Sequence, residues 1–221
     1  MPSPTISYVI AAHGEDELFN LIPYIKQHKD KEDKIIVLNN PTTSEYEAKI
    51  RRMEVKLVNQ PIVNNDYSAY RNSVMDKLTT DYIAWIDCDE VFHPEVHKNI
   101  KSVLVSQNYP DVVILPRLNR VIGIKPIQAL YLNFTLHGEI VSWPDPQTRI
   151  IKVKSKIKWV EPCHEHLDIN KFKHSIVQLD NDIPYAIIHT KTIEKQLATH
   201  KENQLRYADS VYYKGTQLYE G

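Results

Sequence analysis

The sequence is poor in glycine, cysteine and long apolar runs, and each shortage argues against a class of protein. Its 221 residues include only 5 glycines, which leaves no room for a glycine-rich loop that binds phosphate through backbone amides. Two cysteines, Cys88 and Cys163, do not make a disulfide framework, so we expect a reducing, cytoplasmic setting. No apolar run reaches the roughly 20 residues of a membrane span, and residues 1–17 do not have the pattern of a secretion signal.

The charge balance does not favour binding to nucleic acid or to an anionic membrane. The 27 lysines and arginines nearly match the 28 aspartates and glutamates, and the formal net charge is −1. No overall field therefore attracts the chain to polyanions. A chain of this length can bury a substantial core, and with no repeat or linker in view we expect a single domain over residues 1–221.

Short apolar runs alternate with helical patterns in the first half. We expect strands at Ile6–Ala12, Lys34–Leu38, Val55–Val58 and Tyr82–Ile86, and helices at Glu15–His28, Ser44–Met53, Asp66–Leu78 and Pro94–Val105. Pro23 can break or kink the first helix. Strands separated by helices predict an α/β fold with a mostly parallel central sheet and helices on both faces.

The second half has a different pattern. A strand is expected at Val112–Leu115, irregular structure at 117–138 and a long C-terminal helix at 192–214. Alternation over Ile150–Trp159 predicts a strand with Lys152, Lys154, Lys156 and Lys158 on one face. This face is either the solvated side of an edge strand or a contact for an anionic acceptor, such as phosphorylated glycolipid or DNA. Arg117, Arg120 and Lys125 would extend such a contact.

An acidic cluster follows the most apolar strand. The run Tyr82–Ile86 leads directly into Asp87-Cys-Asp-Glu90, and such carboxylates repel one another unless a cation or proton lies between them. In parallel sheets ligands bind at the carboxyl ends of strands, which places 13–15, 39–40 and 87–90 on one rim. Asp87 and Asp89 suit Mg²⁺ or Mn²⁺ held together with a diphosphate; an ordinary acidic loop is the alternative.

Four segments together resemble glycosyltransferase family 2, which has the GT-A fold. They are Ser7–Glu15 (SYVIAAHGE), Lys34–Asn40, Asp66–Asn72 (DYSAYRN) and Asp81–Val91, and both their order and their spacing match. The later segment Trp143–Leu167 resembles the branch related to lipopolysaccharide-core glucosyltransferases. The resemblance divides the domain into a nucleotide-sugar-binding half (1–110), an acceptor-binding half (111–190) and a C-terminal helix (191–221).

The resemblance also implies roles for individual residues. Asp87 would contact the nucleotide ribose or metal-bound water, and Asp89 would bind Mn²⁺ or Mg²⁺. Arg71 would lie near the diphosphate or the sugar. Ala12, His13 and Glu15 would lie near the base and ribose of a nucleotide sugar, with UDP as the first expectation. Two positions depart from the family: His13-Gly14 replaces tyrosine-asparagine, and Asn39 replaces the aspartate that reads uracil.

A second cluster, Cys163-His164-Glu165-His166, supplies candidates for the base. An inverting transfer needs a base that reaches the acceptor hydroxyl, and Glu165 is the first candidate and Asp145 the second. Glu165 can also simply pair with a nearby cation. His164 and His189 are candidate metal ligands, although a histidine at position 189 suits a core equally well. Alternatively, Cys163, His164 and His166 form a zinc site.

The sequence therefore predicts a metal-dependent, inverting glycosyltransferase that moves a sugar from a nucleotide sugar to a hydroxyl acceptor. The acceptor would be a glycan, a glycolipid or another anionic polymer such as modified DNA. Two alternatives stay open. One is a catalytically silent module that binds nucleotide sugars or carbohydrate, and the other is a zinc hydrolase built on Cys163, His164 and His166.

Overall fold

The computed structural model describes residues 3–162, 165–169 and 173–206. The chain divides into two compact units. The first is formed by residues 1–117 and 146–188, and the second by residues 118–145 and 189–221. The single domain expected over 1–221, with divisions after residues 110 and 190, stays a prediction.

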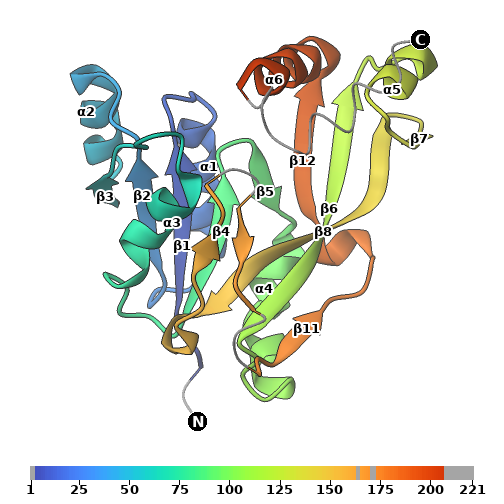
Figure 1. Ribbon diagram of the computed structural model, residues 1–221. Helices are drawn as coiled ribbons and strands as arrows, with labels where there is room; N and C mark the ends of the chain where they lie inside the picture. The colour runs from blue at the N-terminus through green and yellow to red at the C-terminus, as the bar shows by residue number, and fades with distance from the viewer. Residues whose placement is uncertain (1–2, 163–164, 170–172, 207–221) are drawn as a thin grey trace. The chain divides into compact units, whose positions relative to one another are not determined.

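The core of the first unit is a mostly parallel sheet (Figure 1). Four parallel strands lie in the order β3 (Lys56–Asn59), β2 (Lys34–Asn39), β1 (Ile6–Ala12) and β4 (Tyr82–Asp87). The order continues through β8 (Ile140–Lys152), β6 (Val112–Ile122), β12 (Ile187–Thr192) and β5 (Glu90–Phe92). β8 is antiparallel to β4, and β11 (Ile176–Gln178) pairs in parallel with β6. The expected α/β fold is confirmed.

Helices cover both faces of this sheet, because the strands are apolar on both faces. Within β1, Tyr8 and Ile10 face a core that includes α1 (Leu18–His28), α2 (Ser44–Arg52) and α4 (Pro94–Ser106). Val9 and Ala11 face the opposite core, which includes α3 (Tyr67–Met75). A small antiparallel sheet of β9 (Trp159–Val160) and β10 (His166–Leu167) packs on the α3 side. Both faces are therefore buried, as the runs of apolar residues predicted.

Local side-chain bonds explain where several helices begin. Asp66 caps α3 by accepting from the Ala69 N–H at 2.8 Å, and Pro94 occupies the first turn of α4, where its missing N–H costs nothing. The first helix begins at Leu18 and not at Glu15, because the Glu15 carboxylate accepts from the His13 N–H at 2.6 Å and closes a turn. Pro23 lies inside α1 without ending it.

The second half departs most from the sequence-based expectations. Residues 117–138 are not irregular: β6 runs to Ile122 and is followed by α5 (Pro126–Tyr131) and β7 (Leu136–His137). The expected strand at Ile150–Trp159 is wrong beyond Lys152, where β8 gives way to a 3₁₀ turn at Val153–Ser155. A second 3₁₀ turn lies at Ile183–Tyr185.

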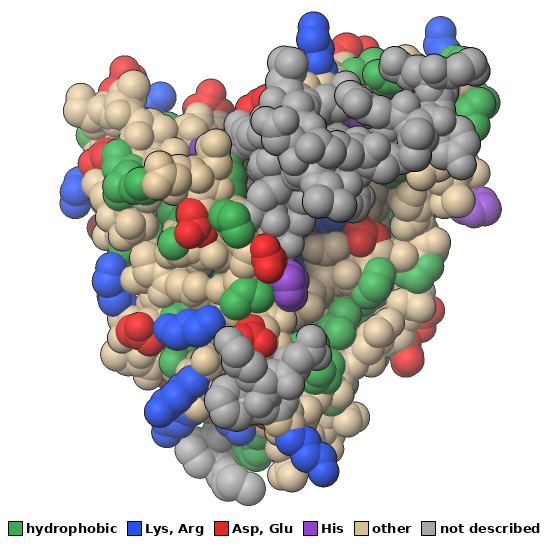
Figure 2. All heavy atoms as spheres, viewed as in Figure 1, with side chains coloured by type: hydrophobic (Ala, Val, Ile, Leu, Met, Phe, Trp, Pro, Cys, Tyr) green, Lys and Arg blue, Asp and Glu red, His purple; other side chains and the backbone are tan. Residues whose placement is uncertain are grey.

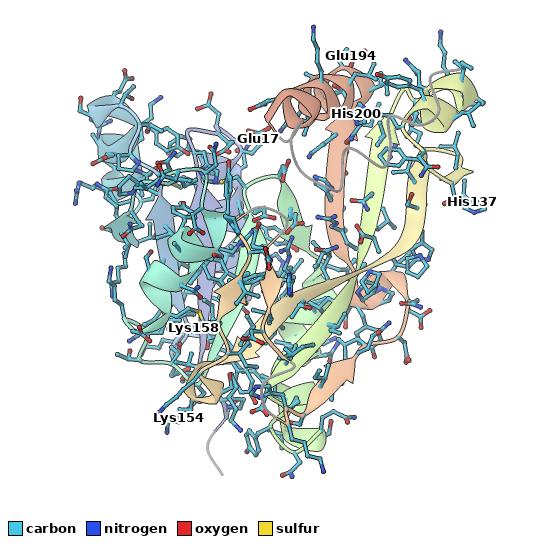
Figure 3. The ribbon with its side chains drawn as sticks, viewed as in Figure 1. Glu17, His137, Lys154, Lys158, Glu194 and His200 are labelled. Atoms are coloured by element: carbon cyan, nitrogen blue, oxygen red, sulfur yellow. The ribbon has the colours of Figure 1, made fainter. Side chains whose placement is uncertain are left out.

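The expected lysine face is consequently not formed by one strand. Lys152 ends β8, Lys154 lies in the 3₁₀ turn, and Lys156 adopts a left-handed conformation with φ of 59°. Lys158 pairs with Asp76 at 3.0 Å. Figure 2 shows basic and acidic side chains mixed on this face of the first unit, and Figure 3 shows Lys154 and Lys158 on the segment that joins β8 to β9.

The second unit has a small core of its own. It contains the distal parts of β6 and β8 and residues 189–192 of β12, together with β7, α5 and α6 (Ile193–Arg206). The buried apolar residues in its described part are Val121, Ala129, Leu132, Val141 and Ile193. The expected C-terminal helix is present as α6, and the rest of its predicted range, 207–214, lies outside the described residues. None of the helices in the described ranges has the length and apolarity needed to traverse a bilayer.

Candidate active site

Three strand ends meet at one rim of the first unit. Ala12 of β1 is in register with Asn39 of β2, and Ala11 is in register with Asp87 of β4. The rim expected from residues 13–15, 39–40 and 87–90 is therefore formed by neighbouring strands. The Asn40 N–H donates to the Ala12 carbonyl at 2.9 Å, which continues the pairing of β1 and β2 one residue past Asn39.

The cysteine between the two aspartates points into the core. Cys88 is buried, and its Sγ–H donates to the Ala11 carbonyl with a separation of 3.0 Å. Burial, reinforced by the nearby carboxylate of Glu15, raises the pKa of this thiol and keeps it protonated. Asp87 is the last residue of β4, and Cys88 and Asp89 lie in the turn that follows it. Asp87 and Asp89 thus flank a buried thiol.

Asp87 is held by two arginines from distant parts of the chain. Its Oδ2 lies 3.0 Å from Arg149 Nη2, and its Oδ1 lies 3.3 Å from Arg71 Nη2. Burial alone would raise the pKa of Asp87, but the guanidinium groups of Arg149 and Arg71 outweigh it and hold the pKa well below its usual range. Asp87 is therefore ionised at neutral pH.

Glu90 extends this network into the interior. Its side chain is 1% exposed, and its Oε1 accepts from Arg149 Nη2 at 2.6 Å and from Arg117 Nη1 at 2.9 Å. A carboxylate at this depth is stable only if it is paired. Burial opposes the charge of Arg149, but Glu90 and then Asp87 outweigh it and raise the pKa of Arg149. Arg117, expected on an anion-binding surface, is instead a partner of Glu90.

The segment Tyr70-Arg71-Asn72 joins the rim to the surrounding strands. The Tyr70 hydroxyl donates to the Leu38 carbonyl at 2.5 Å. Asn72 forms two bonds with the backbone of Trp159, donating through Nδ2 at 2.8 Å and accepting through Oδ1 at 2.9 Å. These bonds fix α3 across the ends of the strands, with Arg71 between its two anchors.

Arg71 itself lies against two indole rings and two carboxylates. Its guanidinium carbon is 5.2 Å from the ring centroid of Trp85 and 4.9 Å from that of Trp159, distances typical of cation–π contacts. Its Nε donates to Glu165 Oε1 at 2.8 Å, and its Nη1 is buried without a hydrogen-bond partner among the described residues. Arg71 therefore connects Asp87 with Glu165 and retains one unused donor.

Asn39 is fully buried at the end of β2. Its Nδ2 donates to Asn59 Oδ1 at 3.0 Å, and its own Oδ1 has no hydrogen-bond partner in the described part of the chain. A buried amide oxygen without a partner is costly. An incoming N–H group, such as one on a nucleobase, would remove that cost.

The remaining predicted site residues are distributed over different parts of the chain. Cys163 and His164 lie outside the described residues, and His166 is exposed on β10. Asp145 and His189 belong to the second unit, where Asn119 joins them: its Nδ2 donates to Asp145 Oδ2 at 2.9 Å, and its Oδ1 lies 2.7 Å from His189 Nδ1. The bond through Oδ1 requires His189 to carry its proton on Nδ1.

A divalent cation fits the rim if phosphate oxygens complete its coordination. Within ranges 3–162, 165–169 and 173–206, no three His, Cys, Asp or Glu side chains are grouped closely enough to hold a metal. Asp87 and Asp89 supply hard oxygen ligands, and Mg²⁺ commonly binds one or two carboxylates together with substrate phosphates. Each oxygen of Asp87 also contacts a guanidinium. The ligand set thus suits a cation that arrives with a diphosphate.

Sequence reasoning placed Glu90 on the rim as part of the acidic cluster, but did not identify Arg149 or the pairing of Glu90 with Arg117. The available signal was an arginine inside an apolar strand, in Thr148-Arg-Ile-Ile151. An arginine at such a position is rarely buried without a carboxylate partner, so a buried ion pair was predictable. The sequence did not show which carboxylate would pair with this arginine.

Comparison with known proteins identifies the family. Residues 7–167 match the model of "Glycosyl transferase family 2", and the chain belongs to this family. The match covers all four segments that suggested the resemblance and extends to β10. The branch related to lipopolysaccharide-core glucosyltransferases stays a prediction. No curated protein matches the sequence.

Solved glycosyltransferase structures share the fold. Residues 1–349 of S. aureus TarS, in complex with UDP-GlcNAc, align with a TM-score of 0.56 and 12% identity. The alignment covers 85% of this chain and 58% of that 1–349 chain. Mannosyltransferase PcManGT from Pyrobaculum calidifontis, in complex with GDP-Man and Mn²⁺, aligns with a TM-score of 0.52 and 12% identity, covering 85% and 57%. The chain thus spans less than two thirds of the length of either protein.

Proposed function

We propose that this protein transfers a sugar from a nucleotide-sugar donor to a hydroxyl group, with Mn²⁺ or Mg²⁺ as cofactor. The observation that carries the proposal is the rim at the ends of β1, β2 and β4. There Asp87 contacts Arg71, whose Nη1 is a buried donor without a hydrogen-bond partner among the described residues, and Asp89 follows Asp87 by two positions. Membership of glycosyl transferase family 2 supports it. The solved relatives bind UDP-GlcNAc and GDP-Man with Mn²⁺, which supports a nucleotide sugar as donor.

The first step of the proposed reaction is donor binding. Asp89 and Asp87 would hold the metal; when bound, it would neutralise the charge of the diphosphate and make it a better leaving group. Arg71 Nη1 is the proposed contact for a phosphate oxygen, because it is a buried donor with no partner in the described ranges. Ala12, His13 and Glu15 are the proposed contacts of the nucleoside, with Asn39 Oδ1 accepting a base N–H. UDP is our first choice of nucleotide.

The second step is the transfer, for which Glu165 is the proposed base. Arg71 Nε fixes Glu165 Oε1 at 2.8 Å, and Oε2 is the proposed proton acceptor. The acceptor oxygen attacks the anomeric carbon and its proton passes to Oε2. The bond between that carbon and the diphosphate oxygen breaks with inversion, and the diphosphate leaves with both bonding electrons. Asp145 is the second candidate base, and His164 and His189 remain proposed metal ligands.

The proposed acceptor is a glycan or glycolipid. The sequence left DNA open as an alternative acceptor, through a row of four lysines on one strand, but that strand ends at Lys152. DNA binding therefore stays a prediction without that row as its support.

A donor-cleavage assay tests the proposal. Release of nucleoside diphosphate from UDP-glucose, UDP-GlcNAc and GDP-mannose would be measured with Mn²⁺, with Mg²⁺ and with EDTA. We expect metal-dependent release from at least one donor, and its loss in Asp89→Asn. Asp76→Asn is the control, because Asp76 is an exposed carboxylate paired with Lys158. A protein that binds a donor tightly but releases no diphosphate under any condition would be a silent binding module.

A further inference from the structure

Two asparagine side chains lie side by side where β2 and β3 end. Asn39 and Asn59 are the last residues of these neighbouring parallel strands and are paired in their register (Figure 1). Residues paired in this way present their side chains on the same face of a sheet. Asn39 is fully buried and Asn59 is exposed, and Asn39 Nδ2 donates to Asn59 Oδ1 at 3.0 Å. The two amides are therefore in direct contact.

The backbone around Asn39 is fixed on both sides. The Asn40 N–H donates to the Ala12 carbonyl at 2.9 Å, and the Gln60 N–H donates to the Asn39 carbonyl at 2.9 Å. Ala12 and Asn59 are also the register partners of Asn39 in β1 and β3. Because the backbone is held between two strands, the side-chain amide is the part of Asn39 that can change its orientation.

The orientation of the Asn39 amide depends on the group that residue 59 offers. In the structure Asn59 accepts, so Asn39 Oδ1 is left buried without a hydrogen-bond partner in the described part of the chain. A half-turn of both amides would keep the bond, with Asn59 Nδ2 donating to Asn39 Oδ1, and would leave Asn39 Nδ2 without a partner instead. Asn39 therefore offers a ligand an acceptor in one arrangement and a donor in the other.

A mismatch of polarity at Asn39 is costly, because a buried polar atom left without a partner loses its hydration without compensation. A site with such an atom discriminates against a ligand that does not complement it. On its Watson–Crick edge uracil carries an N–H donor at N3, whereas cytosine carries an acceptor at the same ring position. An acceptor on Asn39 thus favours uracil, and a donor favours cytosine.

We propose that Asn59 determines the choice of nucleobase by setting the polarity that Asn39 presents to it. This inference rests on the proposed function, which takes Asn39 as a contact of the base. Asn59 is a positioning residue that acts through Asn39. Since its amide both donates and accepts, the wild type permits both arrangements. A side chain at position 59 that can only accept, or only donate, would permit one of them.

Calorimetry with UDP and CDP tests the inference, with each diphosphate titrated in the presence of Mn²⁺. In Asn59→Asp the carboxylate can only accept, which keeps Asn39 Oδ1 available, so the preference for UDP over CDP should rise about tenfold. In Asn59→Lys the ammonium group can only donate, which engages Asn39 Oδ1, so the same preference should fall about tenfold. A merely structural role of Asn59 would change both affinities together and leave their ratio as it is in the wild type.

Asn64→Asp is the matched control, because Asn64 is exposed in the loop between β3 and α3 and the substitution adds the same charge. Repulsion of the diphosphate weakens UDP and CDP alike, so the ratio should stay unchanged. Thermal unfolding checks that the variants are folded, and Asn59→Asp alone decides the test if Asn59→Lys is not. An unchanged ratio in Asn59→Asp, or a shift in the same direction in both variants, would overturn this inference and leave the proposed function intact. If the wild type binds neither diphosphate, the proposed function fails, and this inference fails with it.

Discussion

Replacing Arg149 by methionine should destabilise the protein strongly, because it leaves buried carboxylates short of partners. Arg149 is 5% exposed in its side chain and contacts both Asp87 and Glu90. Without it, Glu90 retains Arg117 at 2.9 Å, and Asp87 retains only the longer 3.3 Å contact with Arg71. Breaking a buried ion pair from one side costs about 3–5 kcal/mol. Since each carboxylate keeps one partner, we expect the lower end, ~3 kcal/mol.

The assay is urea unfolding followed by circular dichroism, with thermal unfolding as a second measurement. For a protein of this size, a loss of ~3 kcal/mol corresponds to a melting temperature about 6–12 °C lower. Arg51→Met is the matched control: Arg51 is 66% exposed and pairs with Glu47 at 3.9 Å within α2. Such a surface pair contributes at most about 0.5 kcal/mol.

A double variant separates lost charge pairing from lost packing. Glu90→Gln should itself destabilise the protein, because Arg149 and Arg117 then lose a charged partner. Glu90→Gln/Arg149→Met removes both charges, so its destabilisation should be smaller than the sum of the two single effects by about 1 kcal/mol or more. If Arg149→Met costs no more than Arg51→Met, or if the single effects simply add, the network does not hold the rim together as described.

Three further predictions concern the nucleotide, the base and acid stability. Among the described residues Asn39 Oδ1 has no hydrogen-bond partner, and a side-chain amide can present either a donor or an acceptor. Calorimetry should therefore find that the affinities for uridine and cytidine diphosphates differ by less than about a hundredfold, roughly 2.7 kcal/mol. A preference for uridine diphosphate above that factor would contradict this prediction. Glu165→Gln should keep donor affinity but lower turnover by roughly two to four orders of magnitude. A larger loss of turnover in Asp145→Asn would transfer the role of base to Asp145. Burial, and then the nearby His28, lower the pKa of His97 to about 4. The wild type should therefore lose up to ~3 kcal/mol of stability as the pH falls from about 6.5 to about 4, because the unfolded chain binds the proton first. The same loss in a His97→Phe variant would show that His97 is not its source.

The sequence alone was sufficient to predict the rim. Parallel strands with intervening helices must end at a common edge, so Asn39 and Asp87 were placed together by topology, without knowledge of any contact between them. The first helices and strands were found because their apolar spacing is regular. Only their ends shifted, as at Leu18, where the hydrogen bond between His13 and Glu15 keeps the chain in a turn.

The arginine network and the structure of the second unit could not be predicted from the sequence in the same way. The partners Arg149 and Asp87 are 62 residues apart, and no local pattern specifies such a pairing. Alternation over Ile150–Trp159 suggested one strand. The Ser155 hydroxyl instead donates to the Lys152 carbonyl at 2.7 Å, which closes a 3₁₀ turn. Side-chain bonds of this kind compete with strand pairing, and the apolar–polar pattern does not register them.

Donor binding with and without Mn²⁺ tests the central claim most directly. Isothermal titration of UDP-glucose, UDP-GlcNAc and GDP-mannose would be performed on the wild type, on Asp89→Asn and on Asp76→Asn. We predict that Mn²⁺ strengthens the binding of one donor to the wild type and to Asp76→Asn, and that Asp89→Asn stays folded but loses this strengthening. Equal enhancement by Mn²⁺ in Asp89→Asn would contradict the account, because the acidic pair at the end of β4 would then not hold the metal.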